Sequence, residues 1–251
     1  MIELFDAWAG FGGGEPGVRE QVTAEDLAAE MDRASIARAL VRTAPEQPHR
    51  DLGDANARLL AACAAAGAGR LIPCGVVVPD TGGDLPSPAQ QIDALLADGP
   101  AAACIRPEMD GWVLADWVAD GLLAALAERR VPVFCRPDHV PLTDVGEIAR
   151  RHPGLPIVVA DVGYRSLRIL RPLMRTFANV HVSTGGAFSV PRGIEYLLDA
   201  GSAERVLFGT GFPASEPMAA VAQLAYAEID ASARADVASG NLDRLLGGTV
   251  R

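Results

Sequence analysis

The sequence of 251 residues contains no lysine, and all 22 of its basic residues are arginine. Lysine is the residue that forms a Schiff base with a carbonyl substrate, so mechanisms that pass through that intermediate are excluded. Mechanisms in which a carbamylated lysine bridges two metal ions are excluded with them. Cysteine is scarce as well: Cys63, Cys74, Cys104 and Cys135 form no Cys-x-x-Cys pair, so neither a disulfide framework nor a zinc site is predicted.

Positive charge is in short supply overall, because 32 acidic residues give the chain a net charge of −10. Nucleic acids and anionic membrane surfaces bind basic patches, so neither is an expected partner. No apolar run approaches the ~20 residues of a membrane span, and no signal peptide is recognisable. These absences predict a cytoplasmic protein whose partner is a small molecule.

Short β-branched runs alternate along the chain with longer segments of helical period. The predicted strands cover residues 2–6, 36–43, 71–78, 102–106, 131–136, 157–161, 180–183 and 205–209. The predicted helices cover residues 24–33, 54–66, 88–97, 114–129, 142–152, 167–177, 191–200 and 218–228. The strands are almost continuously apolar, which is typical of parallel strands covered on both faces. Thr23 followed by Asp26 indicates a capping box at the first helix.

Eight strand–helix pairs in about 250 residues predict one (β/α)8 barrel domain over residues 1–251. An open, doubly wound sheet is the alternative, but no Gly-x-Gly-x-x-Gly motif follows the first strand. His181 lies in the middle of the seventh predicted strand, and we interpret it as a packed core histidine.

Five segments, in order and at matching distances, carry a resemblance that extends over nearly the whole chain. They are MDRASIARA at 31–39, DANARL at 54–59, GRLI at 69–72, LFGTGFP at 207–213 and NLDRLL at 241–246. Together they resemble the amidohydrolase-related barrel family, which includes decarboxylases of the aminocarboxymuconate-semialdehyde type and related hydrolases. The resemblance implies the same barrel fold and a site at the carboxyl ends of its strands.

The resemblance also implies a set of metal-ligand positions. The family has His-x-His after the first strand, histidines at the ends of the fifth and sixth, and an aspartate after the eighth. In this sequence those positions are taken by Trp8 and Gly10, Arg136, Asp161 and Gly211. A metal site needs three or four converging donors, and only Asp161 is one. We therefore predict no metal at these positions and no other cofactor, with the charge of Arg136 replacing that of the cation; a metal held elsewhere, by Asp138, His139 and Glu108, is the minor alternative.

Polar and aromatic side chains at the predicted carboxyl ends of the strands are the candidate site, because active sites of this fold lie there. Three arginines among them predict a small anionic substrate, since guanidinium groups bind carboxylate or phosphate bidentately. The candidates for substrate binding are Trp8, Arg42, Arg106, Glu108, Asp138, Ser183, Thr184 and Thr210.

The candidates for catalysis are Asp161, Arg136 and His139. Asp161 ends an apolar strand, where a carboxylate can act as general acid or base, and His139 can carry protons with Asp138 orienting it. Each has a plainer interpretation: Arg136 and Asp161 form a buried ion pair, and His139 is a surface residue. Trp8 is either a stacking face for the substrate or a plug in the emptied cavity.

Two functions are consistent with these residues. The preferred one is a metal-independent enzyme, a hydrolase or a lyase/decarboxylase, acting on a small anionic, carboxylated or lactone-like substrate. The resemblance supplies a precedent, because pyrone-dicarboxylate lactonases hydrolyse without a metal and bind carboxylates with arginines, although they keep the histidines. The alternative is a catalytically silent barrel that serves as a small-molecule-binding or partner subunit. Apolar surface helices are compatible with a homo-oligomer.

Overall fold

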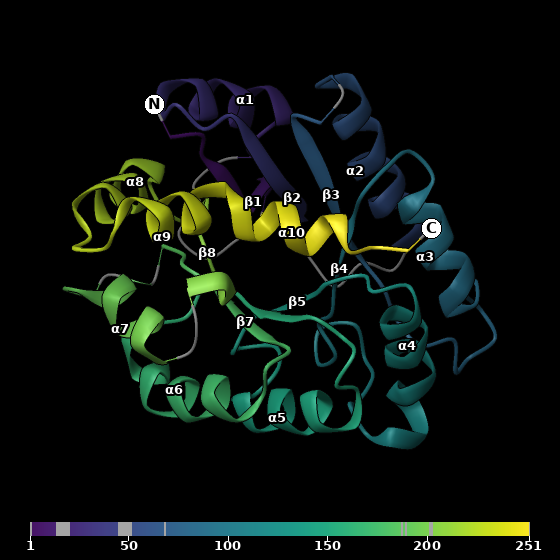
Figure 1. Ribbon diagram of the computed structural model, residues 1–251. Helices are drawn as coiled ribbons and strands as arrows, with labels where there is room; N and C mark the ends of the chain where they lie inside the picture. Colours follow the sequence, from purple (N-terminus) through teal and green to yellow (C-terminus); the bar gives the residue numbers. More distant parts are fainter. Residues whose placement is uncertain are drawn as a thin grey trace.

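The structure, a computed structural model, describes residues 2–13, 21–44, 52–67, 69–186, 188, 190–200 and 203–250. Eight parallel strands follow one another around a barrel in the order of the sequence (Figure 1). They are β1 (Phe5–Gly12), β2 (Arg38–Ala44), β3 (Leu71–Val76), β4 (Ala102–Cys104), β5 (Val133–Cys135), β6 (Ile157–Val159), β7 (Val180–Ser183) and β8 (Val206–Leu207).

The last strand meets the first through two backbone hydrogen bonds. The Ala7 N–H donates to the Phe208 carbonyl at 2.8 Å, and the Gly211 N–H donates to the Trp8 carbonyl at 2.9 Å. These bonds close the sheet, so the predicted (β/α)8 barrel is confirmed.

One helix after each strand covers the outside of the barrel (Figure 1). These helices are α1 (Ala24–Arg33), α2 (Leu52–Ala65), α3 (Pro88–Leu96), α4 (Asp116–Glu128), α5 (Leu142–Arg151), α6 (Leu167–Thr176), α7 (Gly193–Ala200) and α8 (Pro217–Tyr226). The predicted capping box is confirmed, because the Thr23 hydroxyl accepts from the Asp26 N–H and the Asp26 carboxylate accepts from the Thr23 N–H. Among the described residues, no helix is long and apolar enough to cross a membrane.

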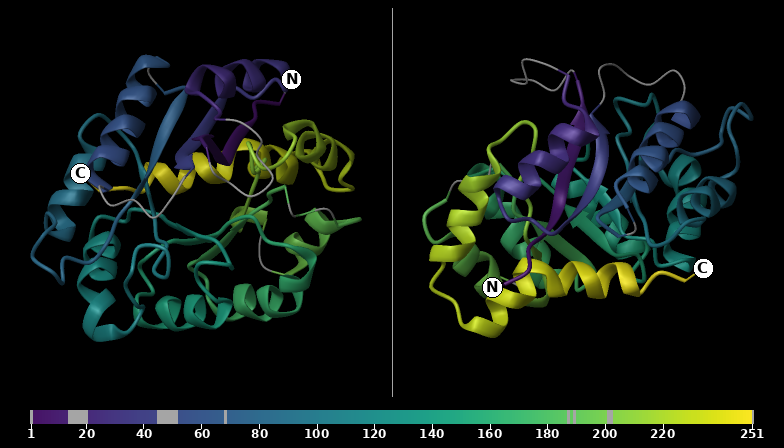
Figure 2. Two further views of the ribbon diagram at one scale, coloured as in Figure 1. Left: turned by 180° about the vertical axis from the view of Figure 1, so that it is seen from behind. Right: turned by 90° about the horizontal axis from the view of Figure 1, so that it is seen from above.

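Two further helices, α9 (Ala231–Ala235) and α10 (Asn241–Gly247), were not predicted. α10 runs across the end of the barrel at which the strands begin (Figure 2). Its Leu242 and Leu246 pack into the barrel interior with Phe5 and Leu207. Because α10 plugs this end, the opposite end, where the strands finish, is left for a functional site.

The first strand differs most from its prediction. The strand was predicted over residues 2–6, but β1 spans Phe5–Gly12. Its register with β2 shifts between Asp6 and Ala9, which is a bulge in the strand. Trp8 and Gly10 therefore lie within a strand of the barrel wall and not after it.

Candidate functional site

A buried carboxylate, Asp6, joins the first and last strands at the mouth of the barrel. One of its oxygens accepts hydrogen bonds from the N–H groups of Trp8, at 2.9 Å, and Thr210, at 3.0 Å. The other accepts from the Thr210 hydroxyl, which itself accepts from the Phe212 N–H at 3.1 Å. Burial raises the pKa of Asp6 above its ordinary value, although these hydrogen bonds oppose the shift. We interpret the hydrogen bonds between Asp6 and Thr210 as the side-chain contact that holds the first strand to the segment after the last strand and so closes the barrel.

Ser183 and Thr184 are also buried and hold β7 to the segment after β8. The Ser183 hydroxyl donates to the Thr184 carbonyl at 2.8 Å. The Thr184 hydroxyl donates to the Gly209 carbonyl at 3.2 Å and accepts from the Gly209 N–H at 2.9 Å. These bonds are structural, and contact of Ser183, Thr184 or Thr210 with a substrate stays a prediction.

Arg106, after β4, forms a bidentate ion pair with Asp110. Nε lies 3.0 Å from Oδ2 and Nη2 lies 2.7 Å from Oδ1. Only 4% of the arginine side chain and 1% of the aspartate side chain are exposed. Asp110 was not among the predicted site residues, and the spacing of four residues was the one signal that could have found it. Glu108, between the two, is exposed, so the structure does not bring it into this pair.

Arg136, after β5, lies between two carboxylates. Its Nε and Nη2 are 3.1 Å and 2.9 Å from the oxygens of Asp138. Nη2 is also 3.6 Å from Oδ2 of Asp161, whose side chain is 14% exposed. The structure therefore brings together the predicted pair of Arg136 and Asp161, with Asp138 as the nearer partner of the arginine.

The backbone around Asp161 is tightly constrained. Asp161 has a φ of 55°, in the left-handed region that few non-glycine residues adopt. Gly185 packs directly against it: a Cβ on Gly185 would lie 2.8 Å from the Asp161 Cα and 2.9 Å from Oδ1. A strained backbone at a residue that carries a carboxylate, held by a close neighbour just after a barrel strand, is a feature of functional sites.

His139 is partly buried, and its imidazole is surrounded by charge. Burial lowers its pKa below the ordinary value of 6.5; Asp138 opposes this shift, and the positive charges of Arg136, Arg106 and Arg42 add to it. The imidazole is therefore neutral at pH 7 and available as a proton acceptor. All three arginines therefore act electrostatically on the same histidine.

Trp8 lies among the side chains of the barrel interior, and Arg42 packs against it. The Arg42 Cζ lies 4.5 Å from the centroid of the Trp8 ring, and the same ring is parallel to that of Phe134, 6.0 Å away. Gly10 provides the space for the arginine, because a Cβ there would lie 3.0 Å from the Arg42 carbonyl oxygen and 3.3 Å from its Cγ. Of the two interpretations of Trp8, a plug is compatible with its 2% exposure.

The residues at the positions that the resemblance assigns to metal ligands do not supply the donors that a metal ion needs. Asp161 is the one donor, Arg136 brings a guanidinium group next to it, and Arg42 fills the space beside Gly10. At Gly211, φ is +74° and a Cβ would lie 2.7 Å from the Gly186 nitrogen. Within the described part of the chain, no three His, Cys, Asp or Glu side chains are grouped so that they could hold a metal.

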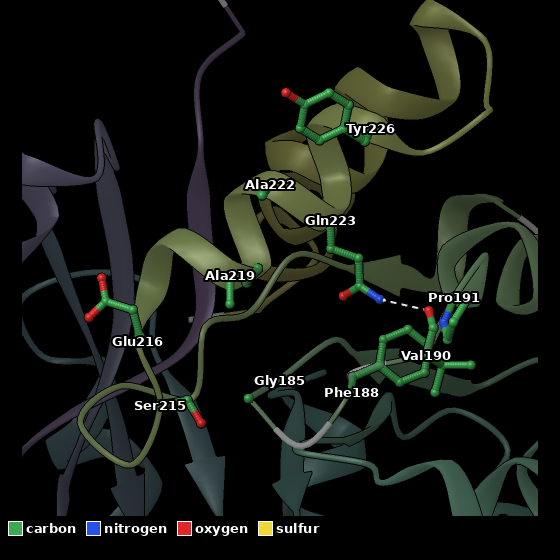
Figure 3. Close-up of a pocket in the computed structure, with 12 residues that line it drawn as sticks. Gly185, Phe188, Val190, Pro191, Ser215, Glu216, Ala219, Ala222, Gln223 and Tyr226 are labelled. Carbon is green, nitrogen blue, oxygen red and sulfur yellow. Dashed lines mark hydrogen bonds between the residues drawn. The ribbon is translucent and has the colours of Figure 1, made fainter.

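A groove of about 630 Å³ adjoins this site between the loop after β7 and helix α8 (Figure 3). Gly185 and Phe188 form one wall, and Ala219, Ala222 and Gln223 of α8 form the other. The Gln223 amide donates to the Val190 carbonyl at 3.2 Å across the groove. Sequence reasoning missed the groove, because small residues of α8 create it and none of them carries recognisable chemistry.

Comparison with solved structures shows the same fold in three decarboxylases. One is a 2,6-dihydroxybenzoate decarboxylase complexed with 2,6-dihydroxybenzoate, with a TM-score of 0.76 and 15% identity over 98% of this chain and 100% of that chain. A 5-carboxyvanillate decarboxylase from Sphingomonas paucimobilis has a TM-score of 0.73 and 15% identity over 98% and 99% of the two chains. A dihydroxybenzoic acid decarboxylase from Polaromonas, with bound manganese and 2-nitroresorcinol, has a TM-score of 0.72 and 14% identity over 98% and 97%.

At these identities the likeness concerns the fold. No curated protein matches the chain in sequence. The sequence itself matches the model of the amidohydrolase family over residues 6–248. This match covers almost the entire barrel. The chain therefore belongs to the amidohydrolase family.

Proposed function

We propose that this protein is a metal-independent hydrolase that acts on a small carboxylated ester or lactone at the barrel mouth. One observation carries the proposal: Asp161 lies 3.6 Å from Arg136 at the ends of two neighbouring strands, and Arg136, Arg106 and Arg42 all act electrostatically on the partly buried His139. Guanidinium groups supply anion recognition, and the histidine and aspartate supply proton acceptors. Structures of the same fold hold small aromatic molecules, among them 2,6-dihydroxybenzoate, which supports a substrate of that size.

In this proposal the chemistry is general-base hydrolysis. A water molecule attacks the acyl carbon, and either His139 or Asp161 accepts its proton. Arg136 stabilises the negative charge that develops on the acyl oxygen, and the proton then passes to the leaving oxygen. Burial, with the positive charge of Arg136 adding to it, lowers the pKa of the His139 imidazole and so favours the neutral form that a base requires.

Hydrolysis is preferred over decarboxylation because of the protonation state of His139. Decarboxylation of an aryl carboxylate requires a proton donor for the ring carbon, whereas a histidine with a lowered pKa is an acceptor at pH 7. Decarboxylation is the second candidate, favoured by the fold that the chain shares with aromatic acid decarboxylases. A barrel that binds without turnover is the remaining alternative, favoured by the complete pairing of Arg106.

The test is an activity screen on protein treated with a chelator, with its metal content measured by mass spectrometry. Carboxylated lactones and aryl esters report hydrolysis, and 2,6-dihydroxybenzoate reports carbon dioxide release. Hydrolysis at sub-stoichiometric metal is the expected result, with a loss of about 100-fold or more in kcat for Asp161→Asn or His139→Asn. Arg150→Met is the control, because Arg150 pairs with Glu147 on the exposed face of α5.

Activity that disappears with the metal and returns when manganese is added would refute metal independence. Carbon dioxide release without hydrolysis would assign the second candidate. Binding without turnover of any compound would leave the silent barrel.

A further inference from the structure

The groove between the loop after β7 and α8 shares one residue with the site at the barrel mouth. Gly185 lines the groove, and a Cβ on Gly185 would lie 2.9 Å from Oδ1 of Asp161. The groove therefore begins beside a carboxylate that the proposed reaction can use as its proton acceptor. Its volume of about 630 Å³ is within the range of small-molecule sites, about 300–1,000 Å³.

Close packing fixes the two walls of the groove relative to each other (Figure 3). Gly186 of the loop lies directly against Ser215, because a Cβ on Gly186 would overlap the serine hydroxyl. Further along, the Gln223 amide of α8 donates to the Val190 carbonyl of the loop at 3.2 Å. These contacts join the loop to the α8 side at two points, so the groove is a preformed feature of the fold.

The lining of the groove is apolar along most of its length. Phe188, which is 2% exposed, lines it from the loop, and Ala219 and Ala222 line it from α8. No arginine or histidine is among the described residues that line it. Glu216 is the one charged residue among them, and its carboxylate forms an ion pair with Arg33. The groove therefore suits an uncharged, apolar group, in contrast to the arginine-rich mouth of the barrel.

We propose that this groove binds the uncharged leaving group of the substrate, an alkyl or aryl-alkyl alcohol, while the carboxylated acyl part occupies the barrel mouth. Arg136, beside Asp161, provides positive charge for the acyl part, and the apolar groove removes the other part from water. The inference rests on the proposed function in one respect, because it takes the occupant to be a leaving group. Among the substrates of that function, it favours open-chain esters over lactones.

The groove should make affinity depend on the length of the leaving group. Complete burial of one methylene lowers a Kd about fourfold. The groove is open to solvent along one side, so about two- to threefold is expected for each methylene. Ala219 and Tyr226 mark its length along α8, about 10 Å, which is enough for a hexyl chain.

The experiment is calorimetry at pH 7 with a series of N-alkyl phthalamates, from methyl to hexyl. Each compound carries a carboxylate for the barrel mouth and a stable amide in place of the ester. The wild-type Kd should fall about two- to threefold with each methylene. In Ala219→Leu and in Ala222→Leu, where the larger side chain fills the groove, the Kd should not depend on the chain. Benzoate, which has no chain, should bind all of these proteins with the same Kd.

Ala225→Leu is the matched control, because Ala225 belongs to the same helix but lines a different pocket, with Met218 and Leu224. It should keep the wild-type dependence on chain length. A further probe tests charge: a chain as long as hexyl that ends in a carboxylate should bind about 10-fold more weakly than hexyl, because the groove offers no cation to pair with it.

A wild-type Kd that does not change with chain length would overturn the groove as a binding site for the leaving group. Unchanged chain-length dependence in both leucine variants would overturn it as well. Ala219 and Ala222 are at least partly exposed, so both variants should fold, which circular dichroism checks.

The failure of the proposed function looks different. The Kd then still falls with chain length and the leucine variants abolish this trend, but no monoalkyl phthalate ester is hydrolysed. Hydrolysis of these esters with a kcat/KM that is independent of chain length would refute the groove and leave the proposed function standing.

Discussion

Removing the guanidinium group of Arg106 should destabilise the fold far more than it affects ligand binding. Arg106 and Asp110 are almost completely excluded from water and form two hydrogen bonds, of 3.0 Å and 2.7 Å. In Arg106→Leu the Asp110 carboxylate would remain buried with its partner gone. Breaking a buried ion pair in this way costs about 3–5 kcal/mol of unfolding free energy. Loss of 3–5 kcal/mol is a large part of the stability of a typical domain.

The double variant Arg106→Leu, Asp110→Leu separates the stabilisation that the ion pair provides from the cost of leaving one buried charge without its partner. Both charges are then absent, and two apolar side chains fill most of the space, so the unfolding free energy should return to within about 1–2 kcal/mol of wild type. The two single costs should therefore not add, and their coupling energy should be of the order of the cost of Arg106→Leu itself.

Urea unfolding at 25 °C, followed by far-UV circular dichroism, measures all four proteins. The midpoints carry the result if the slopes with denaturant agree. A cost below about 1 kcal/mol for Arg106→Leu, together with weaker benzoate binding, would refute a structural pair and return Arg106 to the substrate-binding residues.

Three further predictions concern single residues. Burial lowers the pKa of His181 to about 4. As pH falls, the unfolded chain, in which this pKa is 6.5, takes up the proton first, so His181 should cost at most about 2 kcal/mol of stability between pH 7 and pH 5. Urea unfolding of His181→Phe should lack this loss. Gly185→Ala should reduce activity, because its Cβ displaces Asp161, whereas Gly163→Ala, with open space around its Cβ, should keep wild-type kcat. Asp6→Ala should lose about 3 kcal/mol in the same unfolding assay, since two buried N–H groups lose their acceptor, and Asp6→Asn should lose clearly less; equal costs would contradict the assigned role.

The barrel could be predicted because buried parallel strands are written in the sequence as continuous apolar runs. The same signal placed strand ends too far along the chain. β4 was predicted to end at Arg106 and ends at Cys104, because the apolar pattern continues into Ile105, which is buried and donates to the Phe134 carbonyl but follows the last residue of the strand. The end of β1 was predicted too early, because Gly10 and Gly12 interrupt the apolar pattern, although Gly10 is small to admit the Arg42 side chain.

The candidate site was predictable residue by residue but not as a set of partners. Charged residues directly after apolar strands are visible in a sequence, and this identified Arg42, Arg106 and Arg136. Which carboxylate each arginine meets depends on the path of the loop that follows its strand. The pairing of Arg106 with Asp110, and the contact of Arg42 with Trp8 through a bulge, therefore appear only in three dimensions.

An arginine can replace the charge of a metal ion but not all of its chemistry. A bound divalent cation polarises a carbonyl and lowers the pKa of its water to about 7, which yields hydroxide at neutral pH. A guanidinium group stabilises an oxyanion by hydrogen bonds, yet it leaves the attacking water neutral. The proton must then go to a side chain, and His139, neutral because burial and three arginines lower its pKa, is suited to accept it. Such a site suits substrates with a good leaving group, so activated lactones and aryl esters should be hydrolysed and unstrained amides should not. Amide hydrolysis at a comparable kcat would show that a stronger electrophile than Arg42 and Arg136 operates at the barrel mouth.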